Sequence, residues 1–150
     1  MIDIRKATTS DISAIVGFQL KMASETENIQ LELSTVYKGV ERVFENPSIG
    51  HYWIAEFEGK ILGSMLNLFE WSDWRNGNFI WIHSVFIIPE FRNRGVFSKM
   101  YAHLKSLVEI SDEYKGIRLF VDINNLKAQS VYSVLGMDDE HYKLYEWMKP

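Results

Sequence analysis

The sequence predicts an α/β (α+β) protein, a mixed sheet with helices packed against it. Two segments near the N-terminus have apolar residues at helical spacing, and three strand-like segments joined by turn residues follow them. Helical and strand-like segments then alternate along the rest of the chain. The segment 116–121 is nearly all apolar, which is typical of a strand buried on both faces. These observations give the order β-α-α-β-β-β-α-β-α-β and a single domain over residues 1–150.

The N-terminal third predicts one short strand and two helices. Residues 8–11 are Thr, Thr, Ser and Asp, which are good helix N-caps, and helical spacing of apolar residues follows them. A second helical repeat stops at Pro47, which cannot continue a helix. The predicted elements are a strand at 2–4, a helix at 12–23, a polar and acidic loop at 24–32 and a helix at 33–44.

The rest of the chain predicts five strands and two helices. Gly59 lies in a hairpin signal, and Pro89 closes the third strand of the central run. After Pro89 the apolar residues recur at helical spacing. The predicted elements are strands at 52–57, 61–71 and 79–88, a helix at 96–110, a strand at 116–121, a helix at 125–135 and a strand at 142–148.

Composition excludes several functional classes. The chain has no cysteine, so it has no disulfide framework, thiolate zinc site or cysteine nucleophile, and we expect no metal. A net charge of -4 argues against nucleic-acid binding and favours a cationic substrate. The sequence contains neither an export signal nor an apolar stretch of membrane-spanning length. We therefore expect no membrane partner and a cytoplasmic location.

One turn combines features suited to a phosphate group. It follows Pro89, carries Arg92 and Arg94, and reaches Gly95 at the start of a predicted helix. Helix N-termini attract anions, glycine permits close approach of a ligand to the backbone, and arginine binds phosphate. The same residues also fit a solvated basic turn before an amphipathic helix.

Two segments resemble motifs of the GNAT N-acetyltransferase superfamily. Arg92-Asn93-Arg94-Gly95-Val96-Phe97 is similar to Arg/Gln-x-x-Gly-x-Gly/Ala, although Phe97 stands where glycine or alanine is usual. Residues 125–137 resemble Asn-x-x-Ala-x-x-x-Tyr-x-x-x-Gly-Phe, with Met137 in the last position. The resemblance covers essentially the whole chain and implies the GNAT acyl-CoA N-acyltransferase fold, with acetyl-CoA as co-substrate.

The resemblance also implies roles for individual residues. The Val85 N–H would polarise the thioester carbonyl, and Tyr132 would protonate the departing thiolate. At position 97, the phenylalanine ring would either crowd the phosphates or turn toward the core. The implied coenzyme A contacts are Val85, Phe86, Ile87, Arg92, Asn93, Arg94, Gly95, Val96, Phe97, Ser98, Asn125 and Tyr132.

The general base is open among His83, Glu70 and water. The pKa of an unperturbed histidine suits proton transfer near neutrality, and alternation along a strand puts His83 on the same face as Val85. Tyr52, Trp71, Trp74 and Trp81 form an aromatic-rich region that either holds an alkyl-ammonium group or packs the strands. The candidate acceptor-binding residues are Glu25, Glu27, Glu70, Trp71 and Trp81.

The expected reaction is acetyl transfer to a primary amine by direct attack in a ternary complex. The acceptor is a small molecule such as a diamine, amino acid or amino sugar. The chain also resembles a bacterial GNAT subgroup of undefined substrate and has a layout similar to diamine acetyltransferases, with His83-Ser84 at the position of their acidic strand residue. The alternatives are a protein N-terminal or lysine acetyltransferase, and a non-catalytic acyl-CoA-binding module. A homodimer is a further expectation.

Overall fold

The computed structural model describes residues 1–150 and divides them into two compact units, residues 1–120 and 121–150. The first unit contains five strands, three α-helices and two short 3-10 helices. Its elements are β1 (Asp3–Lys6), η1 (Thr9–Asp11), α1 (Ile12–Glu27), α2 (Leu33–Glu45), β2 (Gly50–Phe57), β3 (Lys60–Ser72), β4 (Gly77–Ile87), η2 (Pro89–Phe91), α3 (Val96–Ile110) and β5 (Tyr114–Leu119). The second unit contains α4 (Leu126–Val134).

The five strands form one sheet in the order β1-β2-β3-β4-β5. Neighbouring strands are antiparallel from β1 to β4, and β4 pairs with β5 in parallel. The parallel pair is possible because α3 carries the chain back between β4 and β5. The mixed-sheet α+β class predicted from the sequence is confirmed.

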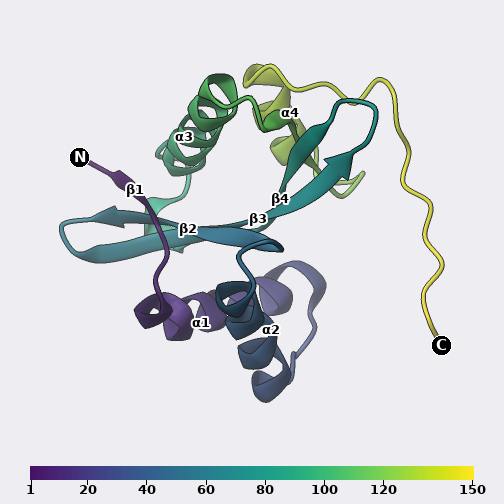
Figure 1. The fold of residues 1–150 in the computed structure, drawn as a ribbon. Helices are drawn as coiled ribbons and strands as arrows, with labels where there is room; N and C mark the ends of the chain where they lie inside the picture. Colours follow the sequence, from purple (N-terminus) through teal and green to yellow (C-terminus); the bar gives the residue numbers. More distant parts are fainter. The chain divides into compact units, whose positions relative to one another are not determined.

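Helices cover both faces of the sheet. Figure 1 shows α1 and α2 on one face and α3 on the other. The α1/α2 face holds a hydrophobic core cluster, in which Ile15 and Ile54 are fully buried. On the opposite face, the Trp53 ring of β2 lies edge-on to the His103 ring of α3, with 4.7 Å between ring centroids. Strand alternation therefore assigns every β2, β3 and β4 side chain to one of these two layers.

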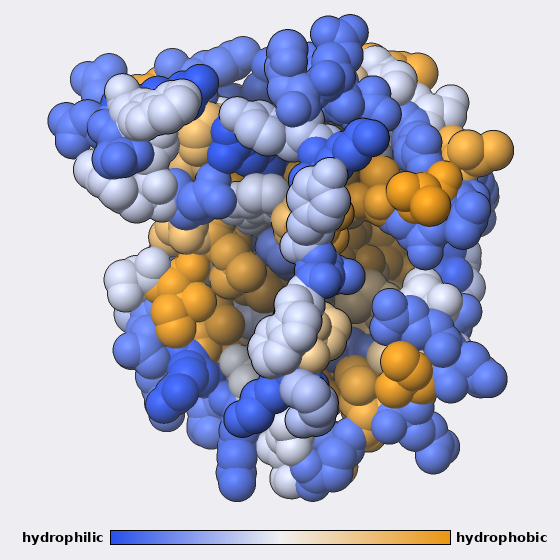
Figure 2. Space-filling view, turned by 90° about the vertical axis from the view of Figure 1, so that its right-hand side faces the viewer, coloured by the Kyte–Doolittle hydropathy of each residue, from blue (hydrophilic) through white to orange (hydrophobic).

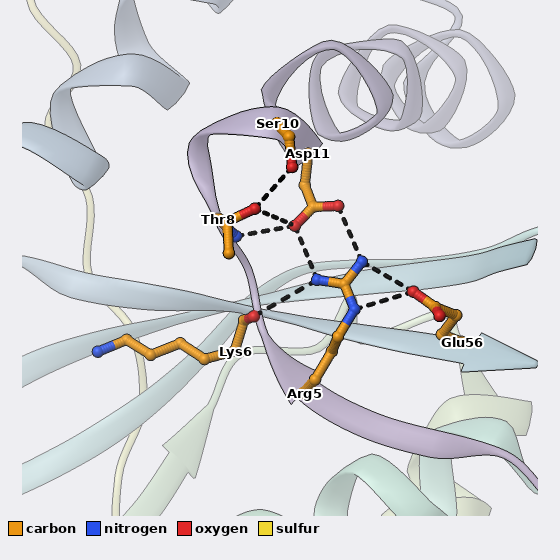
Figure 3. Close-up of polar contacts among 6 residues, drawn as sticks. All are labelled: Arg5, Lys6, Thr8, Ser10, Asp11 and Glu56. Carbon is orange, nitrogen blue, oxygen red and sulfur yellow. Dashed lines mark hydrogen bonds and ion pairs between the residues drawn. The ribbon is translucent and has the colours of Figure 1, made fainter. Parts of the chain in front are cut away.

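An arginine network joins β1, β2 and the start of α1 (Figure 3). Arg5 donates to the Asp11 carboxylate from Nη1 at 2.8 Å and from Nη2 at 2.9 Å, and to Glu56 from Nε at 2.9 Å. The Thr8 N–H donates to the same Asp11 carboxylate at 2.8 Å. Asp11 is buried, and its bonds to Arg5 lower its pKa. The network fixes the point at which the chain leaves the sheet and enters the first helix.

The first helix is longer than the sequence predicted. It continues to Glu27, so that Glu25 belongs to the helix and not to a loop. It ends where Asn28 adopts a left-handed conformation, with φ 52°, and donates its N–H to the Ala23 carbonyl. The residues after Ala23 are polar because this last turn of the helix faces solvent. No apolar residue therefore marked the extension in the sequence.

The predictions for the last two strands were wrong in part. β5 is the last strand of the sheet and its residues are mostly half-buried, whereas a strand buried on both faces was expected. The predicted strand at 142–148 does not form, and the structure assigns no helix or strand to residues 138–150. A strand requires a paired neighbour, and residues 142–148 have aromatic residues at both even and odd positions. As a strand, the segment would therefore put aromatic side chains on both faces.

No helix of the structure combines the length and apolarity needed to cross a membrane. Some large apolar side chains nevertheless reach the surface, where Figure 2 shows separate hydrophobic patches among polar residues. In the turn between β3 and β4, Trp74 is 89% exposed. This tryptophan therefore does not pack the strands, as one interpretation of the sequence required.

Candidate active site

The strand β4 has two neighbours along its first half only. It pairs with β3 over its full length, from Gly77 to Ile87. Its pairing with β5 ends at Ile82, opposite Leu119. Residues 83–87 therefore present one edge that no strand of the sheet occupies, and the backbone N–H and C=O groups on that edge need another partner.

A β-bulge lies where the two strands part. His83 pairs with Leu66 and Phe86 pairs with Ser64, so two residues of β4 stand opposite Met65 alone. One of the two, Ser84, has a left-handed conformation with φ 50°. Left-handed serine is uncommon, and bulges are frequent next to active sites. The sequence offered no sign of this bulge, because no glycine marks it.

The bulge corrects the predicted orientation of His83 and Val85. Leu66 and Ser64 are two residues apart on β3 and share its α1/α2 face, so their partners His83 and Phe86 share that face as well. The stacking of Phe86 on Phe18 of α1, at 5.0 Å between ring centroids, agrees with this assignment. Simple alternation placed Val85 beside His83, and that prediction was wrong because Ser84 adds one residue to the strand.

The turn between β4 and α3 has the backbone conformation of an anion cradle. Asn93 and Gly95 are both left-handed, with φ of 60° and 76°, and α3 begins at Val96. A Cβ atom at Gly95 would meet no other residue within 4 Å, so the space beside it is open. The Phe97 ring does not fill that space and lies 6.4 Å from the Tyr101 ring one helical turn later. The first N–H groups of α3, through Ser98, remain available to an anion.

The two arginines of this turn have different partners. Arg92 donates from Nε to the Ile87 carbonyl at 2.8 Å and from Nη2 to Glu25 at 2.8 Å. Arg94 lies over the Phe91 ring at 5.3 Å, and Lys60 lies over the same ring at 5.5 Å. Sequence reasoning missed Lys60, which the β2–β3 hairpin brings to the turn from far along the chain.

A second group of side chains lies on the α1/α2 face over β4 and β5. The rings of Trp81 and His83 each approach the Phe120 ring, at 4.5 and 6.1 Å between centroids. Farther along, Arg118 donates to Glu70 at 2.7 Å and lies 3.6 Å above the Phe79 ring. Neither Arg118 nor Phe120 was predicted, because β5 had been interpreted as a wholly buried strand.

Burial lowers the pKa of His83 from its ordinary value of 6.5. The imidazole is therefore neutral near pH 7 and can accept a proton. The rings of Trp81 and Phe120 both lie 6.1 Å from the imidazole between centroids, on the α1/α2 face of the sheet. These properties fit a role of His83 as proton acceptor better than the interpretation of His83 as an ordinary surface histidine.

Two predicted acceptor residues lie apart from this group. Trp71 follows Glu70 on β3, and alternation directs it to the opposite face, where it is 60% exposed. Glu27 is the last residue of α1 and is exposed. The aromatic Tyr52 is buried against Phe44 in the α1/α2 core, with 5.8 Å between ring centroids.

The second unit holds the remaining predicted residues. Asn125 caps α4, and its side-chain oxygen accepts the Ala128 N–H at 3.1 Å. Tyr132 lies within α4, and burial raises its pKa. A raised pKa keeps the phenol protonated near neutrality, which suits a proton donor.

Known proteins resemble the chain in sequence and in fold. The sequence profile of the Acetyltransferase (GNAT) family matches residues 19–137. One solved structure is described as a possible acetyltransferase from Clostridium difficile 630, and its sequence is 33% identical to this chain. The match covers 100% of this chain and 99% of that protein's chain, with a TM-score of 0.93. No protein with a curated description matches.

Two more distant structures share the fold. A predicted acetyltransferase from Clostridium acetobutylicum, solved with acetyl-CoA, is 22% identical with a TM-score of 0.76 and covers 97% of this chain and 96% of its own. The structure of AAC(6')-Iy with the bisubstrate analogue CoA-S-monomethyl-acetylneamine is 14% identical, also at 0.76, and covers 100% and 99%.

Proposed function

Since the chain belongs to the acetyltransferase (GNAT) family and is therefore an acetyl-CoA-dependent acetyltransferase, we propose that its acceptor is a primary amine of a small molecule. The profile match includes residues of both units, which supports treating residues 1–150 as one catalytic domain. As in the rest of the family, acetyl-CoA is the co-substrate and no metal is required.

One observation carries the proposal: the free edge of β4 leads directly into the turn that opens α3. Residues 83–86 offer backbone donors and acceptors on the edge that no strand occupies, and these suit the amide groups of a pantetheine arm. The open space at Gly95 and the left-handed turn before α3 suit a pyrophosphate. The chain thus fits both chemically distinct parts of coenzyme A, in the order in which they are joined.

Each proposed catalytic residue has a task set by its environment. Acetyl-CoA supplies the thioester carbonyl. The Val85 N–H, in the bulge, polarises that carbonyl oxygen. His83 takes the proton of the attacking amine, directly or through water, because burial lowers its pKa and its ring lies beside Trp81 and Phe120. Tyr132, with its raised pKa, donates a proton to the leaving sulfur.

Glu70 has a different task in this scheme. Its carboxylate already accepts a hydrogen bond from Arg118, so we assign it to acceptor binding and not to proton transfer. Trp81 and Phe120 supply flat apolar surface between Glu70 and His83. A surface of aromatic rings with one ion pair at its end suits a small acceptor with an extended carbon skeleton.

A screen of amines with thiol release as the readout tests the proposal. The panel contains diamines, amino acids, amino sugars and aminoglycosides, and the comparison set contains peptides with a free N-terminus or a lysine. Turnover of a free small amine, with peptides inactive, is the expected result. Faster turnover of peptides would transfer the function to protein acetylation, and binding of coenzyme A without any turnover would leave only the binding module.

A further inference from the structure

Arg92 contacts three residues, two in β4 and one in α1, and none of them belongs to the α3 N-terminus. Its Nε donates to the last carbonyl of β4, at Ile87, and its Nη2 donates to Glu25 in the final turn of α1. Its guanidinium lies 5.2 Å from the centroid of the Phe86 ring, which stacks on Phe18 of α1. These contacts direct the Arg92 side chain to the α1 face of the sheet.

The left-handed residue between the two arginines separates their side chains. Asn93, with φ 60°, turns the backbone so that Arg92 faces Phe86 and Arg94 faces Phe91 and Lys60. Of the two arginines, only Arg92 has a carboxylate partner within ion-pair distance. Arg94 therefore provides the positive charge of the turn that no carboxylate balances, whereas Glu25 pairs with Arg92 at 2.8 Å and Glu90 lies 4.0 Å from Lys60.

We propose that Arg92 is a positioning residue that fastens the end of α1 to the catalytic strand, and not a phosphate ligand. This inference rests on the proposed function for the location of the phosphates. Residues 28–32, which connect α1 to α2, continue from the helix end that Glu25 occupies, so Arg92 sets where that connection starts. Planar guanidinium groups suit this role because they hold a carbonyl and a carboxylate in fixed directions.

The side chains of Arg92 and Glu25 are 40% and 42% exposed, so their pair contributes little to global stability. Arg92→Gln is therefore expected to fold with an unchanged melting temperature, and its effects on binding and local order can be measured cleanly. Arg94→Gln is the matched control, because it removes the same charge two residues later in the same turn.

Calorimetry with coenzyme A gives the first test. We expect Arg92→Gln to change the affinity by less than about threefold and Arg94→Gln to weaken it by about tenfold. An Arg92→Gln loss as large as that of Arg94→Gln would overturn the inference. If the wild-type protein bound no coenzyme A, the proposed function itself would fail, and the second test would still decide the role of Arg92.

Hydrogen exchange at the end of α1 gives the second test. The N–H groups of Asn28 and Ile29 both bond to the Ala23 carbonyl and report whether the helix end is closed. We expect Arg92→Gln and Glu25→Gln to accelerate their exchange equally, with the double variant no faster than either single variant, because the pair acts as a unit. Unchanged exchange in Arg92→Gln, or additive effects in the double variant, would contradict a positioning role.

Discussion

Replacing Gly95 by aspartate, with asparagine as the matched control, tests the electrostatics of the proposed phosphate cradle. Both side chains are the same size, both tolerate the left-handed conformation that Gly95 adopts at φ 76°, and both are good helix N-caps. Neither Cβ would meet another residue within 4 Å. The two variants should therefore fold equally well and differ only in one negative charge.

That charge would lie at the N-terminus of α3, in the space assigned to the pyrophosphate. At about 4 Å, repulsion between two unit charges ranges from about 1 kcal/mol in water to about 4 kcal/mol near a protein surface. The lower value already reduces affinity about fivefold, and the doubly charged pyrophosphate increases the effect. We expect aspartate to bind coenzyme A at least tenfold more weakly than asparagine.

Isothermal titration calorimetry of both variants at two salt concentrations provides the measurement. From about 0.1 M to 1 M salt the screening length falls from about 10 Å to about 3 Å, so the difference between the variants should shrink. Equal affinities at low salt would refute the reasoning, because the ligand phosphates would then lie elsewhere. A difference that persisted at high salt would show that charge is not its cause.

Three further variants have expected outcomes. Asp11→Asn should lower the free energy of unfolding by about 2 kcal/mol, less than a fully buried pair would lose because Arg5 is about a third exposed. Arg5 lowers the pKa of Asp11 in the folded protein, so the extra stability of the wild type should be complete above about pH 4. It should vanish as the pH falls through that lowered pKa, and urea unfolding across this pH range will check it. His83→Gln should reduce kcat/KM about 100-fold and remove the acidic limb of the wild-type pH–rate profile. The midpoint of that limb should lie below pH 6.5 because burial lowers the pKa of His83. A pH–rate profile identical to the wild type would assign the base to water. Tyr132→Phe should reduce kcat by at least tenfold with coenzyme A affinity within about threefold, and steady-state kinetics with an unaltered rate would remove its role as acid.

The order of elements up to α4 was predictable because local patterns determine it. Turn residues and the change from strand to helical periodicity located β2 to α3 within two residues, and Gly95 marked the turn before α3. These signals depend only on nearby residues. The family resemblance also pointed to residues 85–87 of β4, which lie on the edge that β5 leaves unpaired.

The remaining features depend on residues that are distant in sequence. The bulge at Ser84 arises from the register between β3 and β4, and no glycine or proline announces it. Lys60 reaches the β4–α3 turn only because a hairpin brings it there, and Glu25 meets Arg92 across 67 positions of the chain. Contacts of this kind have no local pattern, so a single sequence could not reveal them.

The extra residue in β4 separates the strand into two stretches that differ in how many of their edges are paired. Before the bulge, both edges are hydrogen-bonded to neighbouring strands, so the backbone that carries side chains such as Trp81 is held on both sides. Beyond it, only one edge of β4 is paired with a strand. In the proposed function, the acceptor therefore meets side chains of the first stretch, and coenzyme A meets the main chain of the second.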